Sequence, residues 1–144
     1  MKLNEPAQLK TAKEFDVRFS EVDAMNIVWH GSYALYFEDA REQFGKVFGL
    51  SYMSYFDNGY YAPLVELSFS YKKPLLYEQK ARIEITYRNT PAAKVVFDYE
   101  IYLTDDNSLI ATGSSTQVFL DSEYNLVWSN PIFYEEWKKK YDLL

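Results

Sequence analysis

The residues most suited to chemistry lie between positions 19 and 44, in the stretch FSEVDAMNIVWHGSYALYFEDAREQF. Asp23 and His30, the only histidine of the 144 residues, stand close together directly before a segment with helical periodicity. A carboxylate can act as a nucleophile or as a general base toward water. The start of a helix offers unpaired N–H groups and a partial positive charge, which favour a developing oxyanion. The spacing therefore predicts a site where an acid and a helix N-terminus lie side by side.

The helix that positions this site is predicted from Tyr33 to Phe48. Its large apolar residues recur at about 100° per residue and form one stripe, made of Tyr33, Tyr36, Phe37, Ala40, Phe44, Val47 and Phe48. We expect this stripe to be buried and Gly31 or Ser32 to cap the start of the helix. Glu38 and Glu42 lie opposite the stripe, and we interpret them as solvated or intersubunit residues rather than catalytic ones.

Alternating apolar and polar residues predict about five antiparallel strands around this helix. The first is predicted at residues 15–19, and four more follow the helix as a meander at residues 65–71, 81–88, 95–103 and 110–120. Each strand is expected to have one face in water. The last segment is predicted as a helix that begins with Asn130 as N-cap and Pro131 at its first position. Its rings at helical spacing are expected to dock it on the sheet: Phe133, Trp137 and Tyr141.

Composition restricts the class of protein further. A chain of this length without a Pro-, Gly- or Ser-rich linker is expected to form a single domain over residues 1–144, with its core at about 13–127 and a helical extension at about 130–144. Cysteine is absent, which excludes disulfides, thiolate ligands and a cysteine nucleophile. The net charge of −6 argues against nucleic-acid binding. No signal peptide and no membrane-spanning stretch is recognisable, so we expect a cytoplasmic protein.

The stretch around Asp23 resembles the acyl-CoA thioesterases of the hotdog fold, in the branch named for 4-hydroxybenzoyl-CoA thioesterase. Three segments and the ring of Tyr33 carry the resemblance: Glu21-Val22-Asp23, Ile27-Val28-Trp29-His30 and Phe37-Glu38-Asp39-Ala40-Arg41. It extends over about residues 13–127. The resemblance implies an α+β hotdog fold, in which a curved antiparallel sheet of about five strands wraps a long central helix.

The same resemblance implies hydrolysis of an acyl-CoA thioester to a free acid and CoA. Asp23 takes the position of the catalytic carboxylate, as nucleophile or general base, and the main-chain N–H at His30 polarises the thioester carbonyl. Trp29 and Tyr33 are expected to contact the substrate, and the cations expected near the CoA phosphates are Lys72 and Lys73, with Arg88 and Lys94 as further candidates. We expect no cofactor and no metal. The predicted assembly is a homodimer or homotetramer, and acyl carrier protein is an alternative carrier of the acyl group.

Several alternatives stay open at this stage. The His30 side chain is interpreted equally well as a functional group and as a partly buried structural histidine. A cluster of rings in a stretch predicted as irregular either walls an acyl pocket or packs over the helix end: Tyr52, Tyr55, Phe56, Tyr60 and Tyr61. Two other functions are a hotdog hydratase or dehydratase acting on acyl thioesters and a non-catalytic module that binds acyl thioesters or lipids. Against the dehydratase, its motifs place the histidine and the acid differently.

Overall fold

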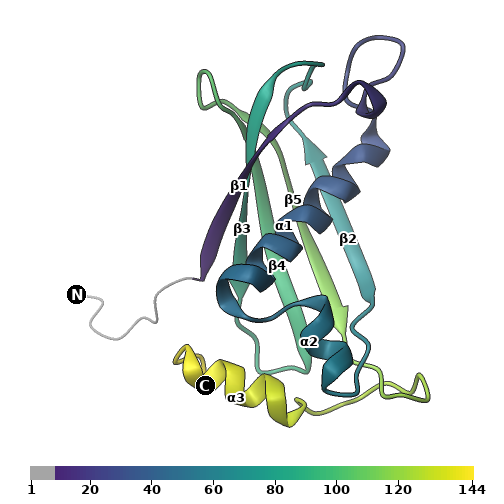
Figure 1. The fold of residues 1–144 in the computed structure, drawn as a ribbon, viewed down its shortest axis with the longest axis vertical. Coiled ribbons are helices and arrows are strands. Elements are labelled where there is room, and N and C mark those ends of the chain that lie inside the picture. The colour runs from purple at the N-terminus through teal and green to yellow at the C-terminus, as the bar shows by residue number, and fades with distance from the viewer. Residues whose placement is uncertain (1–8) are drawn as a thin grey trace.

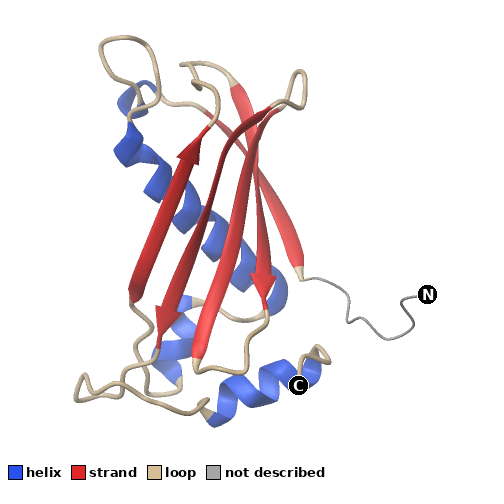
Figure 2. Cartoon of the chain, turned by 180° about the vertical axis from the view of Figure 1, so that it is seen from behind, coloured by secondary structure: helices blue, strands red, loops and turns tan. Residues whose placement is uncertain are grey.

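The computed structural model describes residues 9–144, and one long helix crosses one face of a five-stranded antiparallel sheet (Figure 1). The helices are α1 (Tyr33–Phe48), α2 (Tyr52–Asp57) and α3 (Ile132–Lys140). The strands are β1 (Lys10–Asp16), β2 (Leu64–Tyr71), β3 (Lys80–Arg88), β4 (Lys94–Leu103) and β5 (Leu109–Val118). Figure 2 shows from behind that α1 lies on one side of the sheet only. The predicted α+β hotdog fold is confirmed.

Helix α1 buries most of the stripe that its sequence predicts, because the aromatic residues of this stripe pack against the sheet. Phe37 and Phe44 are fully buried, and the Phe37 ring stacks on that of Tyr99 with centroids 4.0 Å apart. Gly113 of β5 permits this approach, since a Cβ at that position would lie 2.5 Å from the Phe37 ring. The prediction is wrong for Val47, which is 49% exposed. The end of α1 is covered by α3 on the side of Phe48, so Val47 stays at the surface.

Strands β3 and β4 form the centre of the core. Their inward residues are buried as the alternation predicts: Ala81, Ile83, Ile85, Tyr87, Val95, Phe97, Tyr99 and Ile101. The predicted meander is wrong in one connection, since the strand order is β1-β3-β4-β5-β2. Strand β2 pairs with β5 rather than with β3, so residues 72–79 cross past the ends of the inner strands. Strand β2 is consequently an edge strand, and its apolar residues Val65, Leu67 and Tyr71 are exposed.

The ends of several elements differ from their predicted positions. The first strand runs from Lys10 to Asp16 rather than over residues 15–19, because its partner β3 begins at Lys80, opposite Asp16. Phe19 therefore lies outside the sheet in a short 3₁₀ helix, 75% exposed. Ser32 is the N-cap of α1, but its side chain makes no capping bond and its hydroxyl instead donates to the carbonyl of Glu21 at 3.1 Å.

Helix α3 closes the end of the sheet opposite to the start of α1 (Figure 1). Its N-cap is Pro131 rather than Asn130, one residue later than predicted. Trp137 docks as predicted, and its indole N–H donates to the carbonyl of Phe48 at 2.8 Å. Tyr134 is the ring of α3 that the prediction omitted, and it is fully buried with its hydroxyl bonded to Tyr87. Among residues 9–144, no helix is both long and apolar enough to cross a membrane.

Candidate active site

Asp23 lies in a tight loop that presents one carboxylate oxygen and holds the other. Its Oδ1 accepts hydrogen bonds from the main-chain N–H groups of Met25 at 2.8 Å and Ile27 at 3.4 Å. Its own N–H donates to the carbonyl of Ile27 at 2.8 Å. Asn26 takes the left-handed conformation that this turn requires, with φ of 64°. The second oxygen, Oδ2, accepts no hydrogen bond from the described residues, so it is available to a substrate or a water molecule.

His30 begins a short 3₁₀ helix, His30–Ser32, that leads directly into α1. Within the described part of the chain, its main-chain N–H donates to no backbone or side-chain acceptor. The imidazole is exposed and lies against the indole of Trp29, with ring centroids 4.8 Å apart. The structure thus presents both a free N–H at a helix start, where anions are stabilised, and an accessible imidazole. The buried structural interpretation of His30 does not hold.

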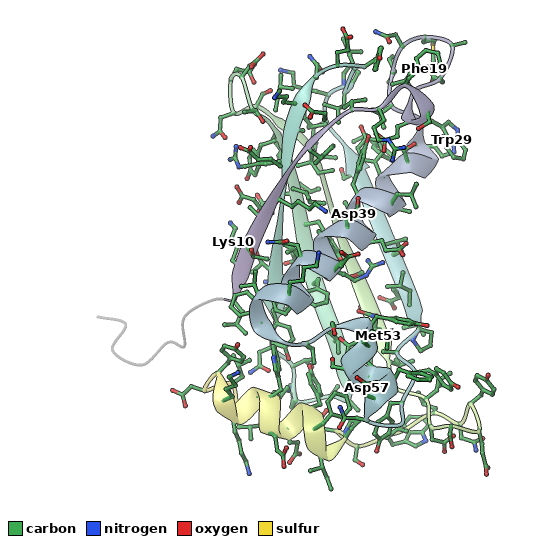
Figure 3. All side chains as sticks on the ribbon, in the orientation of Figure 1. Lys10, Phe19, Trp29, Asp39, Met53 and Asp57 are labelled. Carbon is green, nitrogen blue, oxygen red and sulfur yellow. The ribbon has the colours of Figure 1, made fainter. Side chains whose placement is uncertain are left out.

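One cavity of about 360 Å³ joins Asp23 to the start of α1. All six residues predicted for the site line this cavity: Asp23, Trp29, His30, Tyr33, Lys72 and Lys73. Figure 3 shows Trp29 at the end of α1 that faces away from α3. We call this space the first cavity. Its lining brings two segments far apart in sequence together, and the roles of the six residues stay predictions.

Backbone pairing explains why these two segments meet. Val28 donates its N–H to the carbonyl of Leu75 at 2.8 Å, and Ile27 forms a bridge with Leu76. Lys72 and Lys73 both donate their main-chain N–H groups to the carbonyl of Ile110, which fixes the connection that follows β2. Their side chains are exposed at the rim of the first cavity. Two cations therefore lie beside the cavity in which Asp23 is found.

The other two basic candidates lie elsewhere. Arg88 ends β3 and Lys94 begins β4, at the end of the sheet that α3 covers. Arg88 also forms an ion pair with Asp98 at 2.8 Å. Neither residue lines the first cavity of its own chain, so the expectation that they lie near this site is not met. Their positions at strand ends could not distinguish one end of the sheet from the other.

Burial and aromatic packing define the floor of the first cavity. Tyr33 is 3% exposed and its ring meets that of Tyr71 edge to face at 4.9 Å. Burial, with a smaller contribution from Tyr71, raises the pKa of Tyr33 to about 12. Tyr33 therefore stays neutral at physiological pH and acts as an apolar wall with a polar tip rather than as a base.

A second cavity of about 670 Å³ lies near the other end of α1, between α1, α2 and the start of β2. Met53, which Figure 3 labels on α2, marks its position. The stretch predicted as irregular contains α2, whose N-cap Ser51 accepts from the N–H of Ser54. Tyr52 and Tyr55 line the second cavity, and Tyr55 also packs against Phe119, which follows β5. The interpretation of these rings as the wall of an acyl pocket stays a prediction.

Glu38 and Glu42 are exposed, as their positions opposite the stripe predict. Both line the second cavity, and Glu42 forms an ion pair with Lys46 at 3.0 Å. Sequence reasoning missed Arg41 and Gln117 as lining residues of this cavity. For Arg41 a signal existed, since a charged residue adjoins the apolar stripe of α1. No signal marked Gln117, because an amide inside a strand resembles any outward-facing polar residue.

Comparison with known proteins agrees with this fold. The family model described as "Thioesterase-like superfamily" matches residues 17–137. The "Putative acyl-CoA thioesterase YneP" of Bacillus subtilis (strain 168) is 32% identical over 111 residues, which cover 77% of this chain and 80% of that protein. The crystal structure of the DHNA-CoA thioesterase from Staphylococcus aureus superposes with a TM-score of 0.81 at 26% identity, covering 91% of this chain and 89% of the other.

A more distant neighbour shares the fold alone. The 1,4-dihydroxy-2-naphthoyl-CoA thioesterase Slr0204 from Synechocystis superposes with a TM-score of 0.80 at 19% identity, covering 92% of this chain and 98% of that one. The chain belongs to the thioesterase-like superfamily. The prediction of a thioesterase with the hotdog fold is confirmed, while the narrower branch stays a prediction.

Proposed function

We propose that this chain hydrolyses acyl-CoA thioesters at the first cavity, with Asp23 as the catalytic carboxylate. The observation that carries the proposal is the pairing of a carboxylate with one free oxygen and an unbonded N–H at a helix start in one cavity. Two loop amides hold Oδ1 of Asp23 and orient Oδ2. A fixed carboxylate loses little freedom on reaching the reacting carbonyl.

Two routes lead to the same products. In one, Asp23 takes a proton from water, whose oxygen attacks the thioester carbon. In the other, the carboxylate attacks the carbon itself, and water then hydrolyses the mixed anhydride. In both, the carbon–sulfur bond breaks, the thiolate leaves with its electron pair and is protonated, and the acid is released. The N–H of His30 donates to the carbonyl oxygen as negative charge develops there.

The acyl carrier is proposed to be coenzyme A. The Bacillus subtilis and Staphylococcus aureus relatives are both named as acting on CoA thioesters. Lys72 and Lys73 supply two exposed cations at the rim of the first cavity, in a chain whose net charge is −6. Local cations are required because the phosphates of coenzyme A would otherwise be repelled by an acidic surface. The cytoplasmic location inferred from the sequence stays a prediction.

We further propose that the enzyme is a homodimer joined along β2. This strand is the edge of the sheet, with one side unpaired among the described residues. Leu67 stands opposite the buried Ser115, on the face of the sheet that α1 crosses, yet it is 37% exposed, and Val65 is 55% exposed. An exposed apolar edge strand tends to pair with a copy of itself. A larger symmetric assembly, such as a tetramer, can be built on the same dimer.

Two-fold pairing of β2 would make the active site a shared one. If the whole of Leu64–Tyr71 pairs antiparallel with its copy, Leu64 of one chain stands opposite Tyr71 of the other, about 5 Å apart. Leu64 lines the second cavity and Tyr71 lines the first. Asp23 of one subunit would therefore face the second cavity of its partner across the interface.

The test is an assay with saturated, unsaturated and aromatic acyl-CoAs that follows both free thiol and enoyl absorbance. We expect release of free thiol without a separate change in enoyl absorbance. A change in enoyl absorbance without thiol release would instead establish a hydratase. Binding without either signal would establish a non-catalytic module, and both outcomes contradict the proposal.

A further inference from the structure

The second cavity combines an apolar floor with a small number of polar groups, which is the usual composition of a site for a small ligand. Its apolar lining comes from α2 and the segment before it, from the start of β2 and the segment before it, and from β4: Leu50, Met53, Ala62, Pro63, Leu64 and Phe97. Its volume of about 670 Å³ accommodates an acyl group of moderate size. The hydrogen-bonding groups therefore decide which acyl groups it prefers.

Arg41 is the first of these groups. Its Nη1 donates to the hydroxyl of Tyr99 at 3.0 Å, and that hydroxyl lies 2.6 Å from Oγ of the buried Ser115. This chain of hydrogen bonds fixes the guanidinium against the sheet. Arg41 forms no ion pair with a carboxylate of residues 9–144. Its guanidinium group has further N–H donors besides the one that binds Tyr99. The position thus offers an oriented cation, without an ion-pair partner among the described residues, at the wall of the cavity.

Tyr55 is the second group. The residue is 4% exposed, and its ring packs edge to face on Phe119 with centroids 5.9 Å apart. Its hydroxyl makes no hydrogen bond to a described residue. The oxygen is nevertheless not among the completely buried polar atoms that lack a hydrogen bond. Tyr55 lines the second cavity, and its hydroxyl is the polar group that this side chain can offer to a ligand there. A buried hydroxyl without a partner is costly, and a ligand oxygen would remove that cost.

The charged and polar groups around the cavity do not favour a purely apolar occupant. Four charged side chains line it, with Arg41 and Lys46 positive and Glu38 and Glu42 negative, so their formal sum is zero. Lys46 and Glu42 neutralise each other in an ion pair. Arg41 and Tyr55 are thereby left as the donors that a ligand oxygen can meet.

We propose that the second cavity holds the acyl group and selects acyl groups with a further oxygen, a hydroxyl or a carboxylate, remote from the thioester. Arg41 and Tyr55 are the residues that recognise this oxygen. The inference rests on the proposed thioesterase function and on the two-fold pairing, which places the second cavity of one subunit beside Asp23 of the other. A methyl group in the same position would leave the Tyr55 hydroxyl and the Arg41 guanidinium without a partner.

The experiment compares matched acyl-CoAs that differ only in the remote substituent. One series carries a methyl, hydroxyl or carboxyl group at the para position of benzoyl-CoA, and the other carries the same groups at the end of hexanoyl-CoA. We expect kcat/KM to be about tenfold higher for a hydroxyl or carboxyl member than for its methyl analogue, as for one hydrogen bond to a charged group. The ratio of kcat/KM for the hydroxyl member to kcat/KM for the carboxyl member shows which of the two groups the cavity prefers.

Two variants assign the preference to its residues. Tyr55→Phe keeps the ring and removes one oxygen, and Arg41→Met removes the cation while keeping most of the length of the side chain. We expect each to lower kcat/KM for the oxygen-bearing substrates about five- to fiftyfold and for the methyl analogues less than about twofold. Lys80→Met, an exposed cation outside both cavities, is the charge control. If Arg41→Met unfolds because its bond to Tyr99 is lost, Tyr55→Phe alone tests whether the second cavity recognises the remote oxygen.

Equal rates across each series, a preference for the methyl analogues, or variants that lower all substrates alike would overturn the inference. Failure of the thioesterase function is recognised separately, because plain benzoyl- and hexanoyl-CoA would then release no thiol. In that case titration calorimetry with the same CoA esters measures the preference as binding. If the protein binds the oxygen-bearing esters selectively and Tyr55→Phe loses this selectivity, the recognition site is supported although the protein does not hydrolyse the esters.

Discussion

The hydroxyl of Tyr36 donates a hydrogen bond to Oε1 of Glu21 at 3.1 Å, and this contact ties the Asp23 loop to α1. The same carboxylate oxygen accepts the N–H of Arg18 at 2.7 Å, and the carbonyl of Glu21 accepts the N–H of Trp29 at 2.9 Å. Glu21 therefore joins the start of the loop to its end and to the helix. Burial, with Glu21 as the next cause, raises the pKa of Tyr36 well above its usual value. The tyrosine consequently stays protonated and keeps donating throughout the neutral range.

Buried tyrosines lead us to expect a loss of stability at alkaline pH. Burial raises the pKa of Tyr87 to about 12, as for Tyr33, and raises those of Tyr36, Tyr55 and Tyr134 further. Unfolded tyrosines titrate near pH 10. Because the folded chain keeps protons that the unfolded chain loses, the stabilisation is complete below about pH 10 and decreases as the pH rises above it.

Urea unfolding followed by far-UV circular dichroism between pH 8 and 11.5 measures this decrease. Lys138 acts in the opposite direction, because burial lowers its pKa, but it is one group against five. Tyr36→Phe is expected to reduce the slope above pH 10 and also to weaken the tether to Glu21. A stability that is constant to pH 11.5 would contradict the expectation.

Two glycines allow site and core effects to be separated. At Gly31 a Cβ would lie 1.9 Å from the indole of Trp29, so Gly31→Ala must displace that ring from the first cavity. We expect activity to fall at least about tenfold with little loss of stability, since Trp29 is half exposed. At Gly113 a Cβ would lie 2.3 Å from the carbonyl oxygen of Ser68, in the sheet itself.

Gly113→Ala is the matched control and is expected to destabilise the fold by about 1–3 kcal/mol, as overpacked cores do. Thermal unfolding and thiol release, measured on both variants, check the contrast. Unchanged activity in Gly31→Ala would mean that Trp29 does not shape the site.

The elements predicted best from the sequence are those with a strict period and one buried face. Helix α1 and strands β3 and β4 fulfil this condition, and their inward residues are the ones expected. Strand β2 shows the same alternation, but whether its apolar face is covered depends on the strand order, which a local pattern does not contain. The same limit explains why the strand at residues 15–19 was misplaced, since its end is determined by where β3 begins.

In the candidate site, too, the features that depend on local sequence could be predicted and those that depend on the arrangement of distant segments could not. Asp23 and His30 could be predicted because neighbours in sequence are neighbours around a helix start. The approach of Lys72 and Lys73 to Asp23 depends on the pairing of Val28 with Leu75, which the local sequence pattern did not predict. The second cavity could not be predicted, because it is formed by residues of α1, α2, β2, β4 and β5, whose arrangement follows from the whole fold.

Leu67→Lys tests the proposed dimer. In a fully paired two-fold ladder of Leu64–Tyr71, Leu67 lies next to the axis, so two lysines would come close together and repel each other. We expect light scattering at micromolar concentration to give a dimer or larger assembly for the parent and a monomer for the variant. Activity should fall with the assembly if the site is shared between subunits.

Ser70→Lys is the control for Leu67→Lys, because residues three positions apart in a strand point to opposite faces. We expect this variant to stay associated. A parent protein that is monomeric and active would contradict both the dimer and the shared site.

The oxyanion donor is tested by His30→Ala. The main-chain N–H survives this change, so we expect appreciable thioesterase activity, within about tenfold of the parent. Loss of an oxyanion donor typically costs about 10²–10³ in rate. A loss of that size, with circular dichroism and assembly unchanged, would assign the catalytic role to the imidazole, which the structure places at the surface next to Trp29.

Asp23→Asn tests the central assignment. The amide oxygen of asparagine can still accept from the N–H groups of Met25 and Ile27, so the loop and the fold should be retained. An amide is neither a useful base nor a carboxylate nucleophile, and thiol release should therefore fall by at least about 10³, within the range of about 10²–10⁴ that a general base contributes. Binding of an acyl-CoA, measured by calorimetry, should stay within a few-fold of the parent.

Asp57→Asn is the matched control, because Asp57 is an exposed aspartate at the end of α2 that lines neither cavity (Figure 3). We expect it to keep the activity of the parent. Parent rates in Asp23→Asn would refute the assignment of the carboxylate. The next candidates would then be Glu21, which contacts the same loop, and Glu38, which the two-fold pairing would bring toward the first cavity of the partner.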